Sequence, residues 1–317
     1  MSSVTKSATV EEWKRFSMDL LVSVGMFAAE AEISVDRMLD ADLWKLELDG
    51  LMNLPYSIVA GVSGDMDVRA QLQILNETSA LLMMHGHQAA GRLAATRAVE
   101  SILKKIPEAG VVAVGVKNSQ PLGSPAVFAA MLADAGYIGC CATNAGDSAT
   151  KPFASSTVNF FGTNLMSWAY PVSDEDILLY SQGVHAEDRS AEHFLKLETK
   201  DLQQAYAALM MSTLAGPLQA GKFSLNKTKG QSLEQTQHFL LAIDPEQMGG
   251  KAKFQRELKA SLDQLEAAGE STLKKNLRKT TKHRVLPETL TVTFTEAGWT
   301  TITRQLEKAK LTELQTA

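Results

Sequence analysis

Two histidines, His85 and His87, flank a single glycine, a spacing that suggests metal chemistry. On an extended segment this spacing places both imidazoles on one face, as a pair of metal ligands requires. A zinc site needs three or four protein ligands, however, and no third ligand is apparent nearby. We therefore expect polar surface or turn residues here and predict no metal site. His238 directly precedes an apolar segment and is expected to be a hydrogen-bonded structural histidine.

The spacing of Gly86 and Gly91 imitates the start of a phosphate-binding P-loop. Arg92 and Leu93 stand where that loop needs lysine and then serine or threonine, so the sequence does not predict a P-loop. No glycine-rich dinucleotide fingerprint follows any predicted strand, which argues against an ordinary Rossmann domain. A nicotinamide site in this chain must therefore be built in another way.

The elements that position these residues begin with helices. Thr9 and Glu12 form a capping box before apolar residues at helical spacing, which predicts a helix that ends at Gly25. A second helix is predicted over residues 28–46. Together the two predict a helical N-terminal unit of about residues 1–60.

Helices and strands alternate in the rest of the chain, which is typical of an α/β sheet. A loop region containing Pro55, Gly61 and Gly64 precedes this part. Ser124 and Pro125 are a cap and first-turn pair for one of its helices. The predicted elements are helices at 89–106, 125–136, 202–215 and 254–269, strands at 111–116, 138–143, 237–243 and 289–295, and a terminal amphipathic helix.

Composition places the chain among soluble globular proteins, with 45% hydrophobic and 21% charged residues in a length of 317. The net charge of −5 argues against binding to nucleic acid, which needs an excess of basic residues. No apolar run approaches the ~20 residues that cross a membrane. The adjacent Cys140 and Cys141 form no disulfide framework and, in a buried strand, are poor nucleophiles. We expect a cytoplasmic protein that forms one interwoven domain over residues 1–317.

Five segments follow one another in a characteristic order: NSQPLG at 118–123, ADAGYIG at 133–139, ATN at 142–144, GTNLMSWAYP at 162–171 and HFLLAIDPEQMGG at 238–250. In this order they resemble the malate/L-lactate dehydrogenase family, a non-Rossmann group that also includes ureidoglycolate, sulfolactate and diketogulonate dehydrogenases and cyclic imine reductases. The resemblance implies an α/β fold with a mixed sheet, surrounding helices and a helical N-terminal unit. It also implies a homodimer with active sites between subunits, and NAD or NADP as cofactor.

The family's catalytic motif is changed in this chain. The family has Ser-His-Gly followed by an arginine, whereas the matching stretch here is LDGLMN at 48–53. Asp49 replaces the histidine, and Asn53 replaces an arginine that would pair with a substrate carboxylate. A second family histidine falls on Pro121, beside Gln120. The resemblance therefore implies catalytic roles for Asp49 and Gln120 and substrate binding by Asn53. A carboxyl group replaces imidazole as a proton donor only where burial raises its pKa.

The cofactor positions are partly retained. The small polar residues among them suit a nicotinamide pocket, although Thr163 and Asn164 are equally suited to shaping a turn. Glu288 remains from a family Pro-Gly-Glu motif. The basic segment 274–284 is expected to be a solvated connector, or else to offer Lys282 or Arg284 to a cofactor phosphate. The cofactor residues implied by the resemblance are Ser119, Gly123, Thr143, Asn144, Thr163, Asn164 and Glu288.

Two functions therefore remain open. The first is a divergent NAD(P)H-dependent oxidoreductase that reduces a small carbonyl compound or cyclic imine, with Asp49 as acid or orienting group and Gln120 as hydrogen-bond donor. The second is a family member that no longer transfers hydride and serves as a binding or partner protein. The loss of both histidines favours the second, and the retained fold favours the first.

Overall fold

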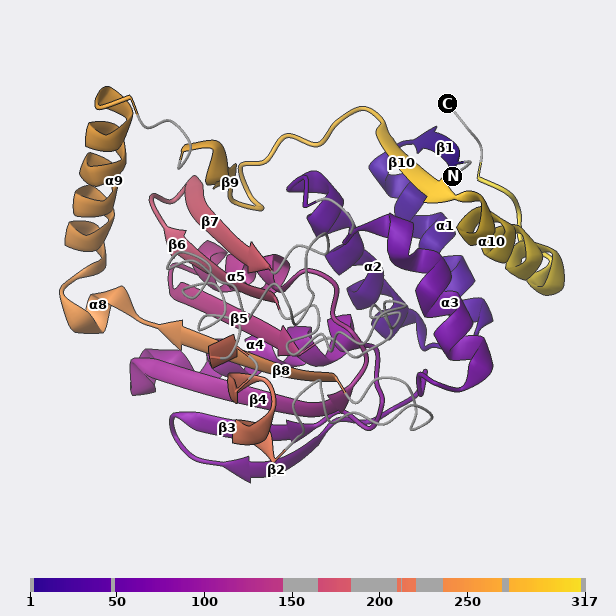
Figure 1. The fold of residues 1–317 in the computed structure, drawn as a ribbon, viewed down its shortest axis with the longest axis horizontal. Helices are drawn as coiled ribbons and strands as arrows, with labels where there is room; N and C mark the ends of the chain where they lie inside the picture. Colours follow the sequence, from indigo (N-terminus) through magenta and orange to yellow (C-terminus); the bar gives the residue numbers. More distant parts are fainter. Residues whose placement is uncertain are drawn as a thin grey trace, which may run out of the picture.

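The computed structural model describes residues 3–46, 49–144, 165–183, 210–211, 213–220, 236–269 and 274–314. Within these residues the chain forms an eight-stranded mixed sheet and a two-stranded sheet, with helices around both (Figure 1). The predicted mixed α/β fold is therefore confirmed. The large sheet has the order β2-β3-β4-β8-β5-β6-β7-β9, in which β3 and β4 are parallel. Its strands are β2 (Gln73–Glu77), β3 (Leu81–His85), β4 (Val111–Ser119), β5 (Ile138–Asn144), β6 (Leu165–Pro171), β7 (Asp176–Gly183), β8 (Thr236–Ile243) and β9 (Leu277–Lys279).

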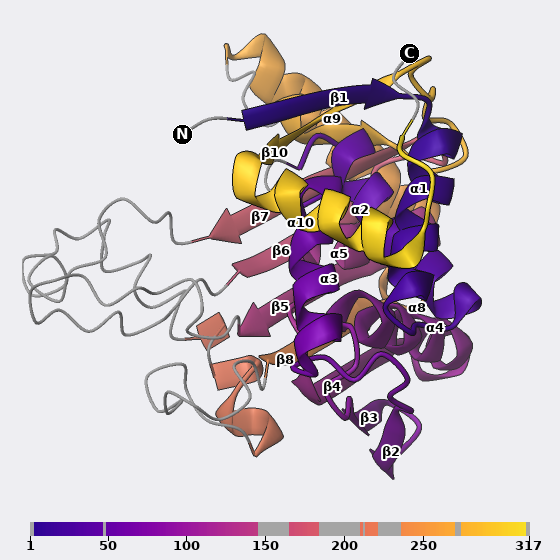
Figure 2. The same cartoon turned by 90° about the vertical axis from the view of Figure 1, so that its right-hand side faces the viewer.

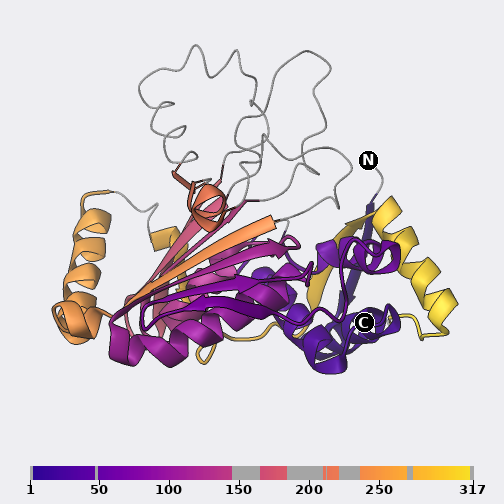
Figure 3. The ribbon, with the colours of Figure 1, turned by 90° about the horizontal axis from the view of Figure 1, so that it is seen from below.

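Helices α4 (Gly91–Ala109) and α5 (Pro125–Asp134) cover one face of the large sheet (Figure 3). Both were predicted from the sequence. The Ser124 side chain caps α5 by accepting from the Ala126 N–H, and alanines along α4 let that helix pack closely on β4. The buried valines of β4 alternate along the strand and face these helices, as period-two burial requires.

The N-terminal helices α1 (Val10–Ser23) and α2 (Ala28–Leu43) form a second hydrophobic core with the C-terminal end of the chain. The predicted capping box of Thr9 and Glu12 is present at the start of α1. Strand β1 (Ser3–Ala8) pairs with β10 (Leu290–Thr295), and α10 (Glu296–Ala309) packs on α1 (Figure 2). Trp13 joins these parts, since its Nε1 donates to the Leu290 carbonyl oxygen at 2.8 Å. The chain's two ends thus build one unit.

The loop predicted around Pro55, Gly61 and Gly64 is wrong, because this segment forms the short helix η1 (Leu51–Asn53) and then α3 (Leu54–Ser63). Pro55 lies in the first turn, where its missing N–H breaks no helical hydrogen bond. Gly64 ends the helix in a left-handed conformation.

The connector predicted at 274–284 is also partly wrong. It contains η5 (Lys274–Asn276) and β9, which adds an edge strand beside β7. The predicted helix at 202–215 lies mostly outside the described residues. The remaining elements are η3 (Pro217–Gln219), α8 (Pro245–Met248) and the predicted long helix, α9 (Lys251–Ala267), which stands at the opposite end of the molecule from α1 (Figure 1). Across the described ranges no helix is both long enough and apolar enough to cross a membrane.

Candidate functional site

The ends of three neighbouring strands bring most of the predicted cofactor residues together. Ser119 and Asn144 are the last residues of β4 and β5. Because β8 lies between these strands, Ser119 is paired with Thr236 and Thr143 with His238. All of these side chains are buried. We name this group the polar strand end, which consists of Ser119, Thr143, Asn144, Thr236, Gln237 and His238.

His238 links the polar strand end to the loop that follows β4. Its Nε2 lies 3.2 Å from the Gln120 carbonyl oxygen, and its Nδ1 lies 2.8 Å from Thr143 Oγ1. Because a carbonyl oxygen only accepts, Nε2 carries a proton and donates to it. Both ring nitrogens thus have partners, and the prediction of a hydrogen-bonded structural histidine is confirmed.

The side-chain amide of Gln120 is held at both ends. Its Nε2 donates to the Asp65 carbonyl oxygen at 2.6 Å, and its Oε1 accepts from the Tyr56 hydroxyl at 3.3 Å. The backbone N–H of Gln120 donates to the Ala89 carbonyl oxygen at 3.0 Å. A Cβ atom at Gly91 would collide with the carbonyl oxygen of Gln120. Glycine at this position therefore lets α4 begin directly against the loop.

A buried ionic cluster of Arg92, Asp42 and Asp49 lies next to this loop. Arg92 is only 6% exposed, and its Nη2 donates to the Asp49 carbonyl oxygen at 3.2 Å. Both aspartates attract the guanidinium electrostatically. Gly123 has a φ of +78°, and a Cβ atom there would lie 2.8 Å from Arg92 Nη2. The left-handed backbone at this point of the loop therefore favours glycine.

Burial raises the pKa of Asp42 and of Asp49 from 3.8 to about 6. The Leu51 N–H, at 2.9 Å from the Asp42 carboxylate, and the charge of Arg92 oppose this rise at Asp42. Arg92 and then the Ser124 hydroxyl oppose it at Asp49. Burial also lowers the pKa of Arg92. A carboxyl group can donate a proton near neutral pH only if its pKa is raised, and the Asp49 carboxyl meets this condition.

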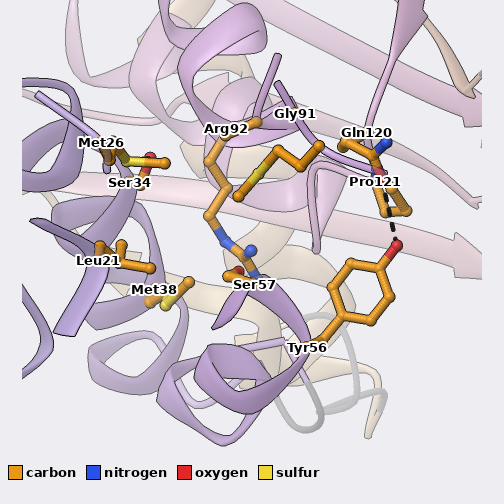
Figure 4. A pocket seen from close by; sticks show the side chains of 12 residues that line it. Leu21, Met26, Ser34, Met38, Tyr56, Ser57, Gly91, Arg92, Gln120 and Pro121 are labelled. Carbon is orange, nitrogen blue, oxygen red and sulfur yellow. Dashed lines mark hydrogen bonds between the residues drawn. The ribbon is translucent and has the colours of Figure 1, made fainter. Parts of the chain in front are cut away.

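A small cavity is lined by Arg92 of the ionic cluster and by Gln120 (Figure 4). Its volume is about 20 Å³, which is room for about one water molecule. The Arg92 side chain extends into it from α4, and the Tyr56 ring borders it from α3. Asp49 is not among the described residues that line it. The other lining residues are Leu21, Met26, Ser34, Met38, Ser57, Met66, Ala90, Gly91, Gln120 and Pro121.

The remaining predicted site residues are dispersed. Asn53 ends η1 and stands before α3, in the same segment as Asp49. Glu288 is exposed and precedes β10, so it belongs to the two-stranded sheet rather than to the polar strand end. Thr163 and Asn164 lie outside the described residues.

Arg284 is engaged within the protein. Its guanidinium pairs with Asp40 at 2.7 Å and lies 5.6 Å from the Trp44 ring centroid. Arg278 in the same segment donates to the Trp44 carbonyl oxygen at 3.1 Å. The basic segment therefore fastens α2 to the edge of the large sheet.

The histidine pair and the cysteines behave as ordinary structural residues. The ring centroids of His85 and His87 lie 4.0 Å apart, and His87 N donates to His85 Nδ1 at 3.1 Å. In the described part of the chain, no three histidine, cysteine or acidic side chains converge as a metal site would require. Burial raises the pKa of Cys140 to about 12 and that of Cys141 further, so neither thiol ionises readily.

Sequence reasoning missed Asp42, Tyr56 and Arg92 as site residues. The signals were present, since Tyr56 follows the altered LDGLMN stretch closely and Arg92 is the residue that breaks the P-loop pattern. These residues could be recognised as site residues only once α2, α3 and α4 were known to meet at one point. Sequence spacing does not reveal this meeting.

Residues 8–180 match the profile of the malate/L-lactate dehydrogenase family, and this range is more than half of the chain. The chain belongs to this family. A malate dehydrogenase of Pyrococcus horikoshii is 26% identical over 167 residues, which cover 52% of this chain and 45% of that relative. The sequence match thus spans about half the length of this relative.

Solved structures show the same fold over nearly the whole chain. Malate dehydrogenase from Pyrococcus horikoshii OT3 gives a TM-score of 0.77 at 18% identity and covers 98% of this chain and 97% of that one. The delta1-piperideine-2-carboxylate reductase of Pseudomonas syringae pvar. tomato gives 0.72 at 15% identity, with coverage of 98% and 96%. At these identities the likeness concerns the fold alone. The chain therefore has the fold of these dehydrogenases over nearly its whole length.

Proposed function

We propose that the protein is an NAD(P)H-dependent oxidoreductase that reduces a small carbonyl compound or cyclic imine. The observation that carries this proposal, beside family membership, is the polar strand end. Thr236 Oγ1 and Gln237 Oε1 are buried there without a hydrogen-bond partner among the described residues, as is the neighbouring Gln219 Oε1. Unpaired buried acceptors are costly, and the amide or hydroxyl donors of a nicotinamide riboside suit them.

NAD(P)H, when bound, supplies the hydride. We assign four residues to the nicotinamide pocket: Ser119, Gly123, Thr143 and Asn144. Three of them belong to the polar strand end, and Gly123 lies in the loop beside it. Thr163, Asn164 and Glu288 remain proposed cofactor contacts from the family resemblance. The dry surroundings of Thr143 and His238 exclude bulk water from this end of the sheet.

The charges at the site favour a substrate without a carboxylate. Two carboxyl groups, Asp42 and Asp49, face the single guanidinium of Arg92. Asn53 lacks the charge and the two-pronged geometry with which an arginine binds a carboxylate. A neutral carbonyl compound or a cyclic iminium ion therefore suits this site better than a 2-oxo acid. Asp49 is assigned an orienting role, since its backbone and carboxylate hold Arg92 and Ser124.

The decisive experiment is a fluorescence titration of the purified protein with NADH and NADPH, followed by an assay of NAD(P)H oxidation with a panel of carbonyl compounds, cyclic imines and 2-oxo acids. We expect saturable binding of one cofactor and turnover of an uncharged or cationic substrate. Absence of binding at millimolar cofactor would remove the proposal.

The second candidate, a binding protein without hydride transfer, is favoured by the cavity itself. Gln120 and Arg92 already have partners inside the protein, and the space between them holds about one water molecule. This candidate predicts no cofactor binding in the same titration, so one experiment separates the two functions.

We also propose a homodimer in which Val59 and Val62 of α3 are covered, while Tyr56 stays open to solvent. The two valines lie three residues apart on this helix, and both are more than half exposed. Such an apolar stripe beside a candidate site is typical of an interface. Light scattering should give twice the chain mass, and a Val59→Asp and Val62→Asp double variant should reduce it to the mass of one chain.

A further inference from the structure

Tyr56 is held in one position by an amide whose own orientation is determined. The Gln120 Nε2 donates to the Asp65 carbonyl oxygen at 2.6 Å, and a carbonyl oxygen accepts only from a donor nitrogen. The other end of the amide, Oε1, must therefore face Tyr56, at 3.3 Å from its hydroxyl oxygen. The phenol consequently donates its proton toward Gln120 in the resting protein (Figure 4).

This phenol lies between the two parts of the site. Gln120 directly follows Ser119 of the polar strand end, and its carbonyl oxygen accepts from His238 at 3.2 Å. Tyr56 also borders the cavity into which Arg92 extends, and the two side chains interact electrostatically. With a side chain that is 40% exposed, Tyr56 remains in contact with solvent.

We propose that Tyr56 is the proton donor of the reductase and replaces the two missing imidazoles. This inference rests on the proposed reductase function. As a hydride reaches the carbon of a carbonyl group or of a neutral imine, the Tyr56 O–H bond breaks and its proton joins the substrate oxygen or nitrogen, so that the substrate gains two electrons and two hydrogens. An iminium ion already carries this proton, so the tests of Tyr56 use a carbonyl substrate. The positive Arg92 stabilises the phenolate that remains. Solvent then returns a proton to the exposed phenolate.

The other candidates are less suitable on geometry. The Asp49 carboxylate accepts from the Ser124 hydroxyl, and Asp49 does not line the cavity. The Gln120 amide has no proton that it exchanges near neutral pH. Gln120 is instead a positioning residue, which holds the Tyr56 hydroxyl.

The first test compares Tyr56→Phe with the wild type and with Tyr180→Phe. Tyr180 is a matched control, because it is 45% exposed but lies on β7 outside the site. We expect Tyr56→Phe to lose about 100- to 10,000-fold in kcat, while NADH or NADPH binding stays within twofold and Tyr180→Phe stays unchanged. The pH profile of kcat/KM should lose its basic limb in Tyr56→Phe. Turnover of Tyr56→Phe within twofold of the wild type would overturn the inference and leave the reductase function intact.

The second test needs no turnover. Phenolate absorbance is followed against pH in the wild type, and the Tyr56→Phe spectrum is subtracted to isolate Tyr56. The same subtraction is made in the Arg92→Met and Arg92→Lys backgrounds. We expect the Tyr56 phenolate to form at a higher pH in Arg92→Met than in the wild type. In Arg92→Lys, which keeps the positive charge, we expect it to form near the wild-type pH. A Tyr56 phenolate that forms at the same pH in the wild type and in Arg92→Met would overturn the inference. Failure of cofactor binding, by contrast, would remove the proposed function itself.

Discussion

The two halves of the candidate site are built from different kinds of interaction. The polar strand end is neutral, and its members are brought together by the register of β4, β8 and β5. The ionic cluster is charged, and its three members come from α2, the segment before η1 and the first turn of α4. One half depends on a sheet ladder, whereas the other depends on three separate segments meeting.

This difference indicates which parts of such a site tolerate amino-acid substitutions. Hydrogen-bonded residues within a sheet are held by both neighbouring strands, so replacing one disturbs the ladder beside it. A charge on a loop or a helix end can be exchanged when a compensating charge is added nearby. In this chain the guanidinium of Arg92 is attracted by Asp42 and Asp49, which come from two other segments.

The largest effect is expected from Arg92→Met, which leaves the two buried aspartates without their counter-ion. The free energy of unfolding should fall by about 3–5 kcal/mol. Urea denaturation followed by circular dichroism measures this loss. A double variant, Arg92→Met with Asp49→Asn, should recover part of it, because the two residues are coupled. Additive losses in the double variant would show that the cluster is not a unit.

Replacing His238 by Leu tests the neutral half at its centre. The Gln120 carbonyl oxygen and the Thr143 hydroxyl both lose their partner, so the free energy of unfolding should fall by about 2–4 kcal/mol. Urea denaturation followed by circular dichroism measures this loss. A change well below about 1 kcal/mol would show that the two contacts contribute little to stability.

The pH dependence of stability should come from the ionic half. In the folded protein Asp42 and Asp49 have pKa values of about 6, above the ordinary value of 3.8. Their contribution to the free energy of unfolding is therefore complete below about pH 4 and is lost as the pH rises through 6. The variant Asp49→Asn, which removes one of the two groups, should therefore decline less than the wild type between pH 4.5 and 7.5, by about 2 kcal/mol. Urea midpoints across this range provide the measurement, and parallel curves would contradict the assignment.

The smallest effect is expected from Thr143→Val, which keeps the side chain's shape and removes one hydroxyl. His238 Nδ1 then lacks its hydrogen-bond partner, and the free energy of unfolding should fall by about 1 kcal/mol. Thermal unfolding detects a change of this size. The matched control is Thr5→Val on exposed strand β1, whose hydroxyl contacts Thr293, and it should change stability less.

Much of the scaffold was predictable because its signals are local. The capping box at Thr9, the cap at Ser124 and the apolar period of α9 depend on residues a few positions apart. The helix at Pro55 was not anticipated, since a proline in a first turn looks the same in a sequence as a proline in a loop. The strand at 277–279 was missed because its partner β7 is far away in the chain and its residues are largely basic.

Within the candidate site, residue types were readable and contacts were not. The sequence by itself indicated the family and the small polar residues at the strand ends, because these are matters of which residue stands at which position. Only the tertiary structure decided that Arg92 meets Asp49 and that Gln120 holds Tyr56. These partners lie 43 and 64 positions apart, and long-range packing of helices against a sheet, which no local pattern encodes, brings them together.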